Sequence, residues 1–260
     1  MSEQPVTVVN YSAPEINHLA AALAEAGLLA AYVRPYANQG RVWERTLSTI
    51  PGMGRLYGRT FGRRQMPGGL LPKHIQESAV AVDLLRAAML HLLTPRGKDA
   101  AEWLHWTIQR RIAQRGARLA SEAKMIVASY MVAEAAFRRT QGVRVLNYPI
   151  AHHCYIQRFA AEEAQREPEF AGTLPDWSAA PPWVEPQLDA ECALADAILV
   201  GSSFARESFV AEGVPAEKLI VVPYGANVSC FAPVQDDARP TTAQPFRRSA
   251  GRPHPCRLRA

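Results

Sequence analysis

Apolar runs and amphipathic stretches alternate along the chain from its first residues. Val6, Val8 and Val9 form a short apolar run, and Ile16, Leu19, Ala20, Leu23 and Ala24 then recur at helical spacing. Pro14 suits the first turn of that helix, and Gly27 can supply the left-handed residue that ends it. A second apolar run at Leu28–Val33 completes a strand, helix and strand, which predicts a right-handed βαβ unit.

The same alternation returns in the second half of the chain. Strands are expected at Lys124–Ser129, Val143–Leu146, Ala197–Val200 and Lys218–Val222. Helices are expected at Val132–Arg139, 156–167 and 187–195, with a proline-rich loop over 171–186, and a last helix capped by Ser203 and ended by Gly213 and Pro215. Continuous apolar strands between helices predict an α/β fold with a Rossmann-like parallel sheet and helices on both faces.

Residues 34–120 interrupt this rhythm with a helical and basic excursion. A short helix is expected near Trp43–Leu47, followed by two longer helices. The first would place Val82, Leu85, Met89 and Leu92 on one face, and the second Leu104, Ile108 and Ile112. Within 34–73, eight basic residues stand against one acid, Glu44. This segment is either a solvated loop or a surface for an anionic membrane, where the nearby Trp103 and Trp106 could sit at the interface.

The formal net charge of +5 comes mainly from the C-terminal tail. Residues 239–260 hold six arginines and no acid, so removing them from the 29 basic residues leaves 23 against 24 acidic ones, a net charge of −1. A near-neutral body gives no reason to expect a nucleic-acid partner. Residues 234–260 are rich in proline and arginine, and we expect a disordered basic tail.

Apolar content and cysteine spacing suggest a compartment. The chain has no apolar run long enough to span a bilayer and no basic region preceding an apolar run at its N-terminus. Its four cysteines are far apart and form no CxxC pair. We therefore expect a cytoplasmic protein, with peripheral binding at the inner face of the membrane if 34–73 contacts lipid.

Candidate site residues follow from the sheet. Ligands of open α/β sheets bind beyond the carboxyl ends of the strands. Three places there carry polar side chains, namely Asn10-Tyr11-Ser12, Ser129-Tyr130 and His152-His153. Either histidine could exchange a proton near neutral pH, although both could equally cap a helix or fill a loop. No metal site is expected, because adjacent histidines without a third ligand are a poor zinc site.

Several common enzyme motifs do not occur in the sequence. The chain contains no GxGxxG after the first strand, no GxxxxGK[ST] and no GxSxG. These patterns would have indicated a dinucleotide site, a phosphate-binding loop and a serine-hydrolase nucleophile, so none of these classes is supported.

The stretch 195–233, ADAILVGSSFARESFVAEGVPAEKLIVVPYGANVSCFAP, resembles glycosyltransferase family 4. Members of that family show an alanine-aspartate, an apolar strand, a serine with an aromatic residue, a helix ending in glycine, and V-P-x-G-x-D-x-x-x-F-x-P. The residues that match the last pattern are Val222, Pro223, Gly225, Phe231 and Pro233, and Asn227 stands where aspartate is usual. Both residue types tolerate a turn with positive φ, so the departure should change little.

The resemblance implies the N-terminal, acceptor-side half of a GT-B glycosyltransferase, spanning residues 1–233. Such an enzyme retains anomeric configuration, uses a nucleotide-sugar as co-substrate rather than a cofactor, and needs no bound metal. Its acceptor would be a glycan or a lipid-linked sugar in polysaccharide biosynthesis. The residues implied on the acceptor side are Asn10, Tyr11, Ser12, Asn17, His18 and Tyr130, with His152 or His153 near the reacting sugar. The residues Pro223, Gly225, Asn227 and Phe231 would form the interdomain linker.

The chain departs from the family after Pro233, where no donor-binding residues are recognised. We expect a truncated or frame-shifted product that is inactive by itself, because the groups that stabilise the leaving diphosphate belong to the donor side. The alternative is a non-catalytic Rossmann-like module that binds a membrane or a partner subunit.

Overall fold

The computed structural model describes residues 6–49, 58, 64, 69–91, 95–174 and 180–225. Residues 1–224 form one compact unit, separate from 225–260. Asn227, Phe231 and the expected tail at 234–260 lie outside the described residues, as does most of 50–68.

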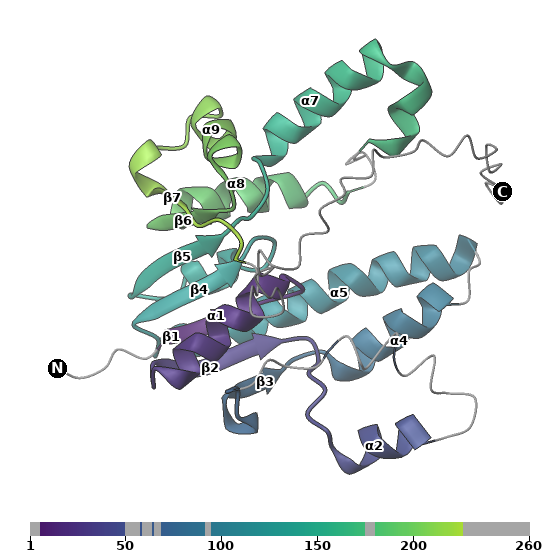
Figure 1. The fold of residues 1–260 in the computed structure, drawn as a ribbon, viewed down its shortest axis with the longest axis vertical. Coiled ribbons are helices and arrows are strands. Elements are labelled where there is room, and N and C mark those ends of the chain that lie inside the picture. The colour runs from purple at the N-terminus through teal and green to yellow at the C-terminus, as the bar shows by residue number, and fades with distance from the viewer. Residues whose placement is uncertain are drawn as a thin grey trace, which may run out of the picture. The chain divides into compact units, whose positions relative to one another are not determined.

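Seven parallel strands form the sheet, in the order β3-β2-β1-β4-β5-β6-β7 (Figure 1). They are β1 (Val6–Val9), β2 (Leu29–Arg34), β3 (Ile75–Glu77), β4 (Met125–Ser129), β5 (Val143–Asn147), β6 (Ala197–Val200) and β7 (Leu219–Val221). The predicted α/β fold with a Rossmann-like parallel sheet is confirmed. Six of the strands coincide with predicted runs, whereas β3 was not predicted, because Ile-Gln-Glu is only three residues long and carries one apolar side chain.

Helices connect the strands and cover the sheet. They are α1 (Pro14–Glu25), α2 (Val42–Thr49), α4 (Val80–His91), α5 (Pro95–Leu119), α6 (Glu134–Phe137), α7 (His153–Arg166), α8 (Val184–Leu194) and α9 (Ser203–Ala211). Short 3₁₀ turns lie at Pro72–His74, Pro168–Thr173 and Ala216–Lys218. No helix in the described ranges is both long and apolar enough to cross a bilayer.

The helix termini largely follow the predicted signals. Pro14 opens α1, and Gly27, with φ of 71°, follows its end. The cap of α9, however, is Ser202 rather than Ser203. Ser202 has an extended backbone, and its hydroxyl accepts a hydrogen bond from the Ala205 N–H at 3.1 Å, whereas Ser203 is already helical.

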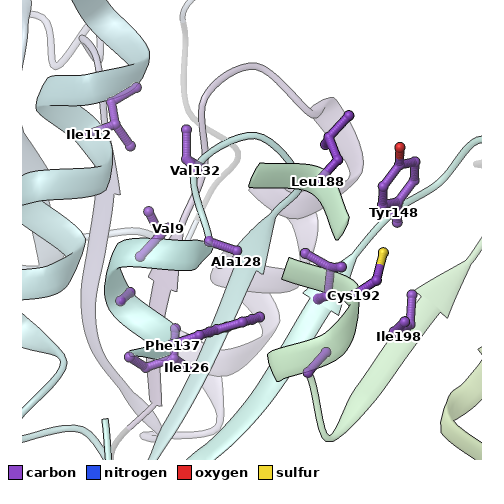
Figure 2. Close-up of a cluster of buried hydrophobic side chains, with 14 of the residues drawn as sticks. Val9, Ile112, Ile126, Ala128, Val132, Phe137, Tyr148, Leu188, Cys192 and Ile198 are labelled. Carbon is purple, nitrogen blue, oxygen red and sulfur yellow. The ribbon is translucent and has the colours of Figure 1, made fainter. Parts of the chain in front are cut away.

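Buried side chains form two clusters, one on each face of the sheet. Val6, Val8 and Val127 pack with α1, through Ile16 and Ala20. The opposite face packs against α5, α6, α8 and α9, and Figure 2 shows that Ile112, Phe137 and Leu188 of three of these helices belong to this cluster. The alternation of strand residues between the two clusters is what a sheet covered on both faces requires.

Of the two long helices predicted within residues 34–120, one packs as predicted and the other does not. Leu104, Ile108 and Ile112 of α5 are buried as expected. On α4, Leu85 is 47% exposed, the buried positions among the described side chains are Asp83 and Ala87, and Val82 is partly buried against the core. The predicted apolar face was therefore wrong at Leu85, because α4 packs beside α5 and buries an aspartate that pairs with Arg64.

Candidate functional site

The sheet changes its direction of growth between β1 and β4. From β1 the chain adds β2 and β3 on one side, then crosses to add β4, β5, β6 and β7 on the other. Ligands of doubly wound sheets bind beyond the carboxyl ends of the strands at such a switch point. The polar residues gathered there are named the switch-point cluster: Asn10, Tyr11, Glu15, Tyr130 and Asn147.

Asn10 forms several hydrogen bonds within the loop after β1 and to the neighbouring strands. Its Nδ2 donates to the carbonyl of Ala13 at 2.9 Å and to Tyr32 Oη at 2.8 Å. Its Oδ1 accepts from Ala13 N–H and from Ser129 Oγ, both at 2.9 Å. Asn10 is 2% exposed and uses both its donors and its acceptor inside the protein. Its amide therefore fixes the loop after β1 against β2 and β4, and presents the neighbouring Tyr11.

Asn17 lies on the first turns of α1 and faces the end of β2. Its Oδ1 accepts from Tyr32 Oη at 2.5 Å and from Arg34 Nη1 at 3.2 Å. Burial raises the pKa of Tyr32, so its hydroxyl keeps its proton as donor. Ser12 and His18 are exposed, so among the predicted loop residues these two face solvent.

Tyr11 reaches a residue that sequence reasoning did not select. Its hydroxyl lies 2.6 Å from Nδ1 of His105 on α5, and Nε2 of His105 lies 3.0 Å from Gln109 Nε2. Burial, and then the charge of Arg86, lower the pKa of His105 to about 4, so the ring is neutral near pH 7. With the Gln109 amide nitrogen donating to Nε2, the ring proton lies on Nδ1 and points at the Tyr11 oxygen. The Tyr11 hydroxyl proton then remains available to a ligand.

Tyr130 follows β4 on a turn with unusual backbone geometry. The next residue, Met131, has φ of 73°, a left-handed conformation that is rare for a residue with a side chain. The Tyr130 ring stacks on Tyr148, with centroids 4.6 Å apart. Strained turns of this kind persist where the surroundings hold them, and they concentrate at functional sites.

The turn is held by Glu191 of α8, which is fully buried. Its Oε2 accepts from Met131 N–H at 2.7 Å, and its Oε1 accepts from Ala133 N–H at 2.8 Å and Glu134 N–H at 3.2 Å. Gln187 adds a further donor to Oε1 at 3.1 Å. Burial raises the pKa of Glu191 to about 7, although these donors act in the opposite direction.

Glu15 brings a carboxylate to the switch point. Its Oε1 accepts from Asn147 Nδ2, at the end of β5, at 2.9 Å. Burial and then Glu15 raise the pKa of Tyr130, and the same two causes act on Tyr224 in the chain beyond β7. Glu15 is half-buried in the first turn of α1, so the cluster has a negative charge among hydroxyls and amides.

His152 and His153 do not belong to the switch-point cluster but lie at the start of α7. Helix α7 begins at His153, three residues earlier than predicted, so His152 is its N-cap residue and His153 its first helical residue. His153 is fully buried and His152 is 5% exposed, and the two rings stack with centroids 4.3 Å apart. Burial, and then His153, lower the pKa of His152 to about 4. His153 is fully enclosed, so a substrate could touch its ring only if the surrounding residues moved, whereas the ring of His152 borders a cavity.

A cavity of about 360 Å³ adjoins the histidine pair. The residues that line it come from α7, α8, α9 and the turn after α9: His152, Cys154, Asp189, Cys192, Ala193, Glu212, Gly213, Val214, Pro215 and Lys218. The cavity thus collects an imidazole, two thiols and two carboxylates in one place.

The family-like stretch has structural explanations for several of its residues. Asp196 accepts three hydrogen bonds from Arg144, two from the guanidinium and one from the backbone N–H. Gly213, with φ of 84°, turns the chain after α9. Pro223 and Gly225 are exposed beyond β7, Asn227 and Phe231 are not among the described residues, and the linker role of these four stays a prediction.

The basic segment is less free than its composition indicates. Arg41 Nη2 pairs with Glu77 Oε2 at 2.5 Å, and the Arg64 guanidinium pairs with Asp83 through two nitrogens at 2.8 and 3.0 Å. Both acids lie outside 34–73, so a charge count within the segment overstated its net charge. Arg55, Arg59 and Arg63, together with Tyr57 and Phe61, are outside the described residues, and membrane binding by 34–73 stays a prediction.

Comparison with known proteins gives little further information. No family model and no curated protein sequence match the chain. Among solved structures it is similar to Os79 from O. sativa, a crystal structure in complex with UDP, at 14% identity and a TM-score of 0.42. The match covers 85% of this chain and 52% of Os79, so the chain spans about half the length of that protein.

Proposed function

We propose that this chain is the acceptor-side half of a sugar transferase that uses a nucleotide-sugar donor. The whole protein would transfer the sugar, with retention of configuration, to a hydroxyl of a glycan or lipid-linked acceptor. The acceptor would bind at the switch-point cluster, and the donor would be held by groups outside this cluster.

The chemistry of the switch-point cluster carries the proposal. Phenol hydroxyls of Tyr11 and Tyr130, the Asn147 amide and the Glu15 carboxylate lie at the carboxyl ends of β1, β4 and β5. Hydroxyls and carboxylates recognise the hydroxyls of a sugar, whereas a carboxylate repels a diphosphate. The absence of a glycine-rich phosphate loop after β1 agrees with an acceptor rather than a nucleotide at this place.

Two further observations support the sugar-transferase class. The stretch from Ala195 to Pro223 carries much of the resemblance to glycosyltransferase family 4, and it follows α8 and contains β6, α9 and β7. In that family the motif that corresponds to 221–233 leads from the acceptor-side domain into the donor-side domain. Pro223 is exposed near the end of the unit formed by residues 1–224, where such a connection would start.

Glu15 has the most direct part in this proposal. Its carboxylate would accept a hydrogen bond from an acceptor hydroxyl, and Asn147 keeps it oriented. Tyr130 would present its hydroxyl beside it, on the turn that Glu191 holds. The neutral His105 would keep the Tyr11 hydroxyl aimed as a donor. None of these roles requires His152 or His153 to touch the acceptor.

Binding measurements with the full chain test the proposal. Glycan and lipid-linked oligosaccharide panels, alongside UDP-, GDP- and ADP-sugars, would be screened by ligand-observed NMR. We expect binding of an oligosaccharide, weakened about tenfold or more in Glu15→Gln and Tyr130→Phe, since each removes one hydrogen-bonding group. Tyr155→Phe is the matched control and should bind normally, because Tyr155 is a partly exposed residue of α7 that contacts Phe204 of α9. Nucleotide-sugar binding that Glu15→Gln abolishes would contradict the assignment of this cluster to the acceptor.

A further inference from the structure

Three consecutive residues at the start of α7 gather metal-ligating atoms. One ligand atom each from His152, His153 and Cys154 lies within 4.8 Å of the other two. A fourth group comes from α8, where Asp189 Oδ1 lies 3.2 Å from His153 Nε2. The sequence analysis considered only the two histidines, although Cys154 directly follows them, and the fold adds the carboxylate of Asp189.

The separation between His153 and Asp189 suits two ligands of one ion. Around a tetrahedral zinc ion, with Zn–N and Zn–O bonds of about 2.0–2.2 Å, two ligand atoms lie roughly 3.3 Å apart. The His153 ring is fully buried, and its Nε2 has the Asp189 carboxylate as its polar contact. Nδ1 of His152, which is 5% exposed and lines the cavity, has no hydrogen-bond partner among the described residues. A bound cation would satisfy buried nitrogens that otherwise lose their hydrogen bonds to water.

The surroundings of the pair resemble the outer sphere of a metal site. His153 Nδ1 lies 3.5 Å from Tyr148 Oη, so the ring nitrogen that faces away from Asp189 has a hydroxyl to orient it. Metal-bound histidines commonly fix their tautomer through such a contact. The cavity beside His152 and Cys154 gives an ion a route to the cluster.

The charges around the cavity favour a cation. Asp189 and Glu212 are the acids that line it, and Lys218 is the base. The Lys218 ammonium is turned to the carbonyl of Ala193 at 3.1 Å. Glu212 is paired with Arg158 at 2.8 Å, which leaves Asp189 as the carboxylate that is closest to the imidazoles.

We propose that His152, His153 and Cys154 bind a thiophilic divalent cation of the zinc class, and that the exposed Asp189 side chain turns toward the ion as a fourth ligand. Two imidazoles, a thiolate and a carboxylate form a four-coordinate set that suits Zn²⁺ or Co²⁺, and that Mg²⁺ and Ca²⁺ do not prefer. On binding, the Cys154 thiol gives its proton to solvent and its sulfur bonds the metal. With four protein ligands the ion would be structural, and it would lock the start of α7 onto α8.

Cobalt spectroscopy of the full chain tests this site. The probe is Co²⁺ titrated into metal-free protein in which Cys230 and Cys256, both outside the described residues, are serine. We expect one Co²⁺ per chain, with a thiolate-to-cobalt charge-transfer band and visible bands of four-coordinate strength, and displacement of Co²⁺ by Zn²⁺. Cys154→Ser should remove the charge-transfer band, and His152→Asn should weaken binding by about tenfold or more.

Two variants keep the test decisive. Cys192→Ser changes the other thiol that lines the cavity and should leave the charge-transfer band unchanged. Asp189→Asn alters a side chain that is 63% exposed, so it should fold normally and bind Co²⁺ more weakly. No band in the parent protein at stoichiometric Co²⁺, or a band that survives Cys154→Ser, would overturn the proposal.

Discussion

Replacing Glu191 by glutamine asks whether a buried carboxylate holds the turn that carries Tyr130. In the protein, Oε1 accepts from Ala133, Glu134 and Gln187, and Oε2 accepts from the N–H of Met131. A glutamine can keep its oxygen at the Oε1 position, but its amide nitrogen then faces the Met131 N–H across 2.7 Å. One of four hydrogen bonds is lost and a buried donor is left unpaired, which costs about 1–3 kcal/mol.

Glu191→Ala should cost more than glutamine, because it removes all four hydrogen bonds and leaves a cavity. Relief from burying a carboxylate offsets part of this loss, and we expect about 3 kcal/mol or more. Urea unfolding at pH 7 gives both free energies, with Glu185→Gln as the control on the exposed face of the same helix, expected within about 0.5 kcal/mol of the wild type. Near-ultraviolet circular dichroism reports the Tyr130–Tyr148 stack.

The test compares two losses in the free energy of unfolding, and Glu191→Gln should lose less than Glu191→Ala. If Glu191→Gln were as stable as the wild type, the Met131 N–H would not depend on Oε2. If glutamine cost as much as alanine, the oxygen retained at the Oε1 position would contribute nothing. Either result would refute the explanation of the left-handed Met131 as a conformation imposed by Glu191.

Three further predictions concern stability. The pKa of His105 lies near 4 in the folded protein, against 6.5 ordinarily, so acid favours the unfolded chain. Between pH 7 and pH 5 the free energy of unfolding of the wild type should fall by about 1 kcal/mol more than that of His105→Asn, after allowance for partial exposure. Urea unfolding that shows the same fall in both proteins would contradict this. Gly116→Ala should destabilise by about 1–2 kcal/mol despite a better helix propensity, because its Cβ would lie 2.9 Å from Cγ2 of the buried Val9, and a raised Tm would be the opposite result. Asp196→Asn should cost under about 1 kcal/mol in thermal or urea unfolding, since its pair with Arg144 is partly exposed, and a loss above about 2 kcal/mol would show a larger role.

The regular part of the fold could be predicted because strands and helices have different apolar periods. Six strands follow from short apolar runs, and α5 follows from Leu104, Ile108 and Ile112. The predictions that failed concern features that depend on contacts between residues far apart in the sequence. The buried face of α4 could not be predicted, because Asp83 is buried only through its pairing with Arg64.

The candidate site could be predicted as a place but not as a set of contacts. The rule that ligands bind beyond carboxyl ends selected Asn10, Tyr11 and Tyr130, and the strand order brings their loops to one switch point. His105 was not found, because it contacts Tyr11 across 94 positions of sequence and no local pattern marks it. Glu191 has the same difficulty, since a glutamate on a helix normally indicates an exposed face.

Tyr148 connects the two places that the histidines and the switch point occupy. Its ring is fully buried, stacks on Tyr130 and meets Phe209 edge-on at 5.0 Å, while its hydroxyl lies 3.5 Å from His153. A ring packed on these sides cannot shift without moving Tyr130, because protein interiors have little free volume. The histidine pair would therefore influence the switch-point cluster through the position of Tyr148. That role needs no contact between an imidazole and the substrate, and it agrees with the burial of both rings.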